Sequence, residues 1–116
     1  MNLISVQSQI KANQYLEETI TQLEKDFLMI GINFDIEKPV ANYKTLFVFT
    51  YNLVNTINKQ HPKRILNLLY RIDLPEEMVQ KQMQETDLAF TEILAELIVK
   101  RELYKVVLKK KYKDLK

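Results

Sequence analysis

The chain of 116 residues contains a single glycine, Gly31, and three prolines, Pro39, Pro62 and Pro75. A sheet protein of this size needs several residues with positive φ in its turns, and a loop that cradles phosphate needs clustered glycines. Helices joined by a few turns need neither. The scarcity of glycine therefore predicts an all-α fold and argues against a nucleotide-binding loop.

Length and composition indicate one helical domain over residues 1–116. Hydrophobic residues make up 47% of the chain and charged residues 28%, which is typical of a packed domain. No apolar run approaches the roughly 20 residues of a membrane span, and the N-terminal residues lack the pattern of a signal peptide. Because there is also no cysteine to form disulfides, we expect a cytoplasmic protein.

Apolar periodicity and turn residues predict a fold like a four-helix bundle. The expected helices span residues 8–30, 42–60, 62–72 and 75–112. In the first, apolar residues recur four and three positions apart, and Gly31 suits its C-terminal end. Asp73 with Glu76 resembles a capping box ahead of the fourth helix.

The second of these segments is ambiguous between helix and strand. Residues 45–51 are rich in β-branched and aromatic side chains, which favour a strand. A lone strand would have no partner elsewhere in the chain, so we favour a helix. Apolar residues then cover most of the circumference of its first half, which indicates a central helix or a homodimer contact. The candidate oligomer surface comprises Val48, Phe49 and Tyr51.

The fourth segment has the longest periodic pattern. Apolar positions keep a spacing of four and three through Phe90, Ile93, Leu97, Tyr104 and Leu108. Such a constant phase favours one continuous helix over residues 75–112, longer than its neighbours can cover. The alternative is a break near residues 85–87, where Thr or Asp could cap a second start.

Residues that could carry catalysis or bind a metal are scarce. The only histidine, His61, precedes Pro62 in an expected turn, and with no cysteine a zinc site of the His/Cys kind is impossible. Glu92 and Glu96 lie one helical turn apart, but on the predicted phase they point mostly away from the core. We therefore expect no catalytic residue, no metal site, no cofactor and almost no carboxylates inside the core.

Positive charge is concentrated at the C-terminal end. Residues 100–116 hold eight Lys or Arg against two Asp or Glu, whereas residues 1–99 hold nine against thirteen. Four cations recur at four-residue intervals and form a ridge on the predicted helix, which three cations of the third helix could extend. The candidate surface for an anionic partner comprises Lys63, Arg64, Arg71, Arg101, Lys105, Lys109 and Lys113. The alternative interpretations of this surface are a solvated helix end, a protein contact, a nucleic-acid contact and a membrane contact.

Two stretches, LLYRIDLPEE and LAELIVKRELYKVVLKKKY, resemble segments of small, uncharacterised, all-helical bacterial proteins of about this length. The resemblance covers the C-terminal half and includes no catalytic motif. It implies a single helical domain and no particular activity.

Together these observations predict a non-enzymatic helical module for protein–protein interaction, with a homodimer or another protein as partner. A nucleic-acid-binding accessory protein that uses the basic C-terminal helix is the alternative.

Overall fold

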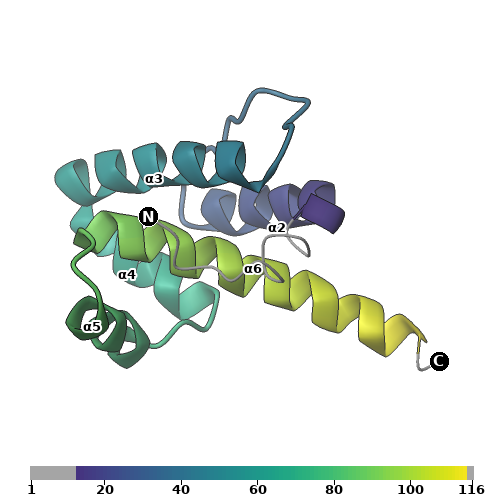
Figure 1. Cartoon of the computed structure of the whole chain (residues 1–116). Helices are drawn as coiled ribbons and strands as arrows, with labels where there is room; N and C mark the ends of the chain where they lie inside the picture. Colours follow the sequence, from purple (N-terminus) through teal and green to yellow (C-terminus); the bar gives the residue numbers. More distant parts are fainter. Residues whose placement is uncertain (1–12, 115–116) are drawn as a thin grey trace.

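A computed structural model describes residues 13–114, in which all regular structure is helical. The helices are α2 (Leu16–Met29), α3 (Tyr43–Gln60), α4 (Pro62–Arg71), α5 (Glu76–Glu85) and α6 (Phe90–Asp114). This confirms the predicted all-α fold with a long C-terminal helix (Figure 1). Residues 8–12 of the first predicted helix lie outside the described residues, and Tyr15 precedes the start of α2 as its N-cap.

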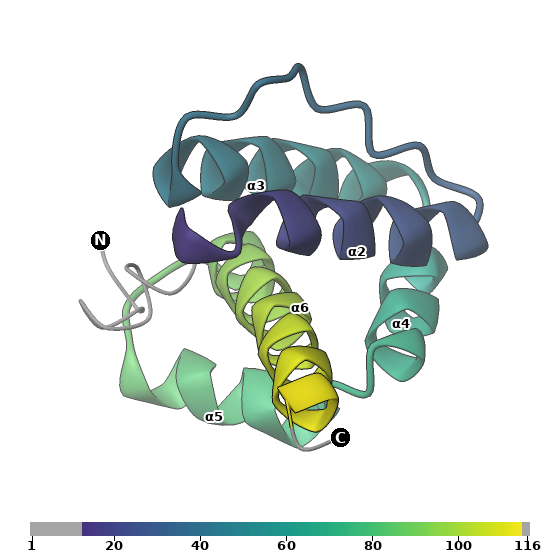
Figure 2. The ribbon, with the colours of Figure 1, turned by 90° about the vertical axis from the view of Figure 1, so that its right-hand side faces the viewer.

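α6 is the central helix of the molecule. It contacts α2, α3 and α5, and residues 93–99 are buried one after another. Figure 2 looks nearly along α6 and shows α2 and α3 on one side of it and α5 on the opposite side. A helix needs neighbours on several sides when its apolar residues surround its axis. The C-terminal part of α6 extends beyond this packed region (Figure 1).

Residues 45–51 lie within α3, as the helical interpretation predicted. Asn42 caps the helix, because its side-chain oxygen accepts a hydrogen bond from the Thr45 backbone N–H at 3.0 Å. The buried face repeats at helical spacing through Tyr43, Leu46, Thr50, Val54 and Ile57. Tertiary packing and this cap outweigh the strand propensity of the segment.

The continuous helix predicted over residues 75–112 is wrong, and the alternative of a break is correct. α5 ends at Glu85, and Thr86 adopts an extended conformation with φ −135° and ψ 161°. Its hydroxyl accepts a hydrogen bond from the Leu88 backbone N–H at 3.4 Å and donates one to the Gln82 carbonyl at 3.1 Å. This corner turns α6 back so that α5 packs against it.

Two helices end in the same way, with a residue in the left-handed conformation. Gly31 has φ +81°, and the Ile32 N–H donates to the Phe27 carbonyl at 3.0 Å, which closes α2 in a Schellman motif. Asp73 has φ 60° and closes α4 similarly, with the Leu74 N–H donating to the carbonyl of Leu69. Asp73 therefore ends α4, and the predicted capping box is wrong, because α5 has no side-chain cap.

Candidate interaction surfaces

An open groove runs between α5 and the second half of α6. We call it the α5–α6 groove, and its volume is about 930 Å³. On the α5 side it is lined by Leu74, Pro75, Glu77, Met78, Lys81 and Gln82. On the α6 side it is lined by Leu97, Lys100, Arg101, Leu103, Tyr104, Val107, Leu108 and Lys111. It lies on the side of α6 opposite to α2 and α3 (Figure 2).

The floor of this groove is the apolar stripe that the sequence phase predicted along α6. Leu97 is buried, Leu108 is half-buried, and Tyr104 is 53% exposed. Met78 of α5 faces the same groove with 46% of its surface exposed. The stripe thus starts in the core and continues onto a surface that the described residues leave open.

Three lysines at the edges of the α5–α6 groove have no internal ion pair. Within the described part of the chain, no carboxylate lies within 4.0 Å of the amino groups of Lys81, Lys100 or Lys111. Arg101 differs, because it donates to the Ile72 carbonyl at 2.8 Å and lies 3.7 Å from Asp73. Among the lining residues the one carboxylate is Glu77, so the groove has a positive rim.

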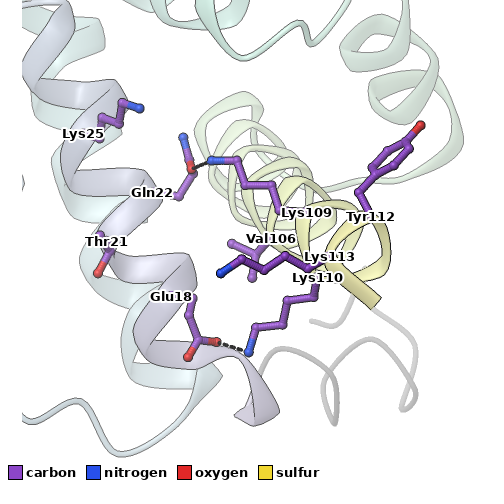
Figure 3. Close-up of a pocket in the computed structure, with 9 residues that line it drawn as sticks. All are labelled: Glu18, Thr21, Gln22, Lys25, Val106, Lys109, Lys110, Tyr112 and Lys113. Carbon is purple, nitrogen blue, oxygen red and sulfur yellow. Dashed lines mark hydrogen bonds and ion pairs between the residues drawn. The ribbon is translucent and has the colours of Figure 1, made fainter. Parts of the chain in front are cut away.

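A second hollow, of about 710 Å³, lies between α2 and the end of α6 (Figure 3). We call it the α2–α6 cleft, and its lining comprises Glu18, Thr21, Gln22, Lys25, Val106, Lys109, Lys110, Tyr112 and Lys113. Lys109 donates to the Gln22 side-chain oxygen at 3.0 Å, and Lys110 lies 3.5 Å from Glu18. Lys25 and Lys113 have no ion pair among the described residues.

The C-terminal ridge predicted to contact an anionic partner divides into two parts. Arg101 and Lys105 have internal acceptors, since Arg101 donates to the Ile72 carbonyl at the end of α4 and Lys105 lies 3.3 Å from Asp26. Lys109 and Lys113 line the α2–α6 cleft instead. The regular spacing therefore does not produce one continuous exposed ridge.

The cations of α4 are likewise divided. Arg64 donates to the Gly31 carbonyl at 3.1 Å, and Arg71 donates to Asp26 at 2.9 Å. Lys63 is exposed. Two of the three predicted extensions of the basic surface thus stabilise the contact between α4 and α2.

A buried carboxylate cluster joins α2, α4 and α6. Asp26 is 2% exposed and accepts hydrogen bonds from Arg71 at 2.9 Å, Gln22 at 3.0 Å and Lys105 at 3.3 Å. Glu102 is fully buried, and Lys105 Nζ lies 3.4 Å from one of its oxygens. The expectation of almost no carboxylates inside the core is therefore wrong; Arg71 and Lys105 compensate the charge of Asp26.

The two carboxyl groups of this cluster have opposite pKa shifts. Burial opposes ionisation of Asp26, but its interactions with Glu102, Gln22 and Lys105 outweigh burial and lower its pKa to about 2. Burial, followed by the Asp26 carboxylate, raises the pKa of Glu102 to about 9. Among the described residues neither Glu102 oxygen has a hydrogen-bond partner, so burial beside the Asp26 carboxylate favours the neutral, protonated form of Glu102.

Glu96 corrects a second expectation about carboxylates. It was predicted to point away from the core, yet it is 4% exposed and accepts a hydrogen bond from the Tyr43 hydroxyl of α3. Burial and then the Glu96 carboxylate raise the pKa of Tyr43 well above its usual range. Glu92, one turn earlier, is only half-buried. Glu96 is buried because α6 has neighbours around its whole circumference at this level.

Residues 13–114 provide no group of three or more histidine, aspartate and glutamate side chains arranged to hold a metal ion. His61 is exposed and lies between α3 and α4, in the turn that the sequence predicted. The helices of this described range also include none with the length and apolarity that a membrane crossing requires.

The predicted oligomer surface is partly covered by the chain itself. The Phe49 ring packs edge-on against Phe34 of the α2–α3 connection, with centroids 4.9 Å apart. Tyr51 is half-buried and stacks on Phe47 at 6.4 Å. Val48 remains 47% exposed. The connection between α2 and α3 thus covers one of the three side chains considered for a dimer contact.

Comparison with known proteins identifies no relative of this chain. No protein-family model, no curated protein and no solved structure matches this chain.

Proposed function

We propose that this protein is a non-enzymatic protein–protein interaction module that binds a helix of its partner in the α5–α6 groove. The observation that supports this proposal is the apolar stripe of Leu97, Tyr104 and Leu108, which continues from the core into an open groove. A helical stripe with alternating spacing of three and four residues is the pattern by which one helix packs along another. An amphipathic helix in such a groove is a recurring mode of recognition.

A selection experiment tests this function. A displayed library of amphipathic helical peptides is selected on the full chain, and the enriched clones are assayed on Tyr104→Ala and on Tyr70→Ala. Tyr70 is the matched control, because it is 86% exposed and does not line the groove. We expect binding that is lost in Tyr104→Ala and retained in Tyr70→Ala. Enriched clones that bind both variants equally would contradict the proposal, as would a selection without enrichment.

A homodimer remains part of this proposal. Val48 is the side chain of the candidate oligomer surface that is most open to a second copy, and two-fold pairing is the commonest oligomeric arrangement. Light scattering at micromolar concentration tests it. A monomeric mass would exclude the dimer without affecting binding in the groove.

Nucleic-acid binding is the second candidate, and one observation favours it. Lys25 of α2 lines the same cleft as Lys109, Lys110 and Lys113 of α6, so positive charge from two helices is collected in one place (Figure 3). Such a surface can contact phosphate groups. The internal contacts of Arg101 with the Ile72 carbonyl and of Lys105 with Asp26 remove two cations from this candidate surface.

Binding of random-sequence duplex and single-stranded DNA, measured by fluorescence anisotropy at two salt concentrations, tests this candidate. The informative variant is Lys25→Glu with Lys113→Glu. Its control is Lys44→Glu with Lys59→Glu, which changes net charge equally at the two exposed ends of α3. Salt-sensitive binding that only the first variant abolishes would support a phosphate contact in the cleft. Absence of binding at low salt would exclude it.

A further inference from the structure

From the charges around the α5–α6 groove, we infer that the helix it binds is acidic. The inference rests on the proposed function and specifies the chemistry of the partner: apolar residues on one face of a helix, with Asp or Glu on the flanking positions. The three groove lysines, Lys81, Lys100 and Lys111, were not among the residues singled out from the sequence.

The lysines are placed where flanking charges of a bound helix would lie. Lys100 and Lys111 belong to α6 and Lys81 to α5, so positive charge is present on both walls and at the far end of the groove. In paired helices, charged residues that flank an apolar seam select the partner and its orientation. Among the described residues that line the groove, Glu77 is the only carboxylate, which leaves the rim with an excess of positive charge.

These lysines are also free to form new ion pairs. Three other cations of α4 and α6 have internal acceptors: Arg71 and Lys105 contact Asp26, and Arg101 contacts the Ile72 carbonyl. No carboxylate of the described residues lies within 4.0 Å of a groove lysine. An acidic partner would therefore gain new attraction without breaking an existing pair, whereas a basic partner would meet repulsion.

The dimensions of the groove favour a helix of several turns. The stretch from Leu97 to Lys111 on α6 is about 21 Å long at 1.5 Å per residue. A helix of about 14 residues matches that length and presents apolar side chains at the spacing of the stripe. Tyr104 in the middle of the floor has an exposed ring, a residue type enriched among the energetically dominant positions of interfaces.

Three fluorescent 18-residue helical peptides test this inference. They share leucines at positions spaced three and four apart and differ only in their flanking residues, which are Glu, Gln or Lys. Binding to the full chain is measured by anisotropy at two salt concentrations. We expect the Glu peptide to bind at least about tenfold more tightly than the Lys peptide, with a preference that decreases in high salt.

Charge reversal in the groove gives the decisive comparison. Lys100→Glu with Lys111→Glu is expected to abolish or reverse the preference for the Glu peptide. Lys44→Glu with Lys59→Glu, at exposed positions of α3 outside the groove, changes the net charge equally, and it is expected to change affinity by less than about twofold. Circular dichroism of each variant verifies that the helices are retained.

The outcomes separate the inference from the proposed function. If all three peptides bind with equal affinity and Tyr104→Ala abolishes that binding, the groove binds helices without regard to charge, and the acidic partner is excluded. If none binds, or if Tyr104→Ala binds as well as the wild type, the helix-binding function itself is excluded. A groove-bound Glu peptide could also be displaced by duplex DNA, by anionic vesicles or through self-association of the chain. Any of these results would identify another occupant and overturn the inference.

Discussion

The two sides of α6 use the same kinds of charged residue in opposite ways. On the side facing α2 and α4, Lys105 and Arg71 contact Asp26 in a buried cluster. On the side facing α5, Lys100 and Lys111 line an open groove and have no acidic neighbour within 4.0 Å among the described residues. The comparison shows that residue type does not decide whether a lysine stabilises the fold or remains available for a partner. Its position around the helix axis does.

Removal of the acidic centre of the buried cluster is expected to have the largest effect. Asp26→Ala leaves Arg71 and Lys105 without their buried acceptor, and we expect a loss of about 3 kcal/mol in the free energy of unfolding. Because the pKa of Asp26 is lowered to about 2, this contribution is present above pH 4 and disappears as pH falls through about 2. Urea unfolding at pH 7 and at pH 2.5 measures it.

Glu24→Ala is the matched control for that variant on the same helix. Glu24 pairs with Lys38 at 3.0 Å, but both side chains are substantially exposed. Exposed ion pairs contribute up to about 1 kcal/mol. An equal loss of stability in the two variants would show that burial of Asp26 has no special importance.

The protonated member of the cluster should respond in the opposite direction. Glu102 has a pKa raised to about 9, so between pH 4.5 and pH 9 the folded state holds a proton that the unfolded state has released. Wild-type stability therefore falls as pH rises through this interval. Glu102→Gln keeps the shape of the side chain but removes the titrating group, and we expect it to be more stable than the wild type by about 1–2 kcal/mol near pH 8.

Thermal unfolding of the wild type and Glu102→Gln from pH 5 to pH 9 checks this expectation. The difference between their midpoints should widen with pH, whereas Glu92→Gln, at a half-buried position of the same helix, should run parallel to the wild type. A constant difference for Glu102→Gln would show that Glu102 is ionised in the folded state throughout this range.

The smallest effect on stability is expected on the groove side. Lys100→Ala and Lys111→Ala remove no internal ion pair, so each should change the free energy of unfolding by less than about 0.5 kcal/mol. Chemical unfolding of both variants provides the measurement. A loss comparable to that of Asp26→Ala would mean that these lysines have a structural role and would remove the contrast between the two sides of α6.

Much of the fold could be predicted from the sequence, because glycine scarcity and helical periodicity are local signals. The helical state of residues 45–51 and the end of α2 at Gly31 followed from them. The corner at Thr86 was harder to predict, since the apolar phase continues almost unchanged across it. The Thr86 hydroxyl makes local hydrogen bonds where α5 ends. Apolar periodicity carries no information about such bonds.

The buried carboxylates could not be predicted, although each lies among apolar neighbours in the sequence. Asp26 lies three residues after Leu23 and next to Phe27, and Glu102 follows Val99 by three. Charged residues are rarely buried unless they are paired, and the partners of Asp26 on α4 and α6 are distant in the chain. The helical phase of the groove stripe was predictable because it is a local signal in the sequence. Whether the stripe is exposed was not predictable, because that depends on where α5 packs.

The central position of α6 also has a consequence for synthesis. α6 is the last of the described helices to leave the ribosome, yet α2, α3 and α5 all contact it. Until it emerges, α2 and α3 lack the helix against which both pack in the finished fold. Folding of the nascent chain is therefore expected to be completed only after translation of α6, and truncated chains should be substrates for chaperones or proteases.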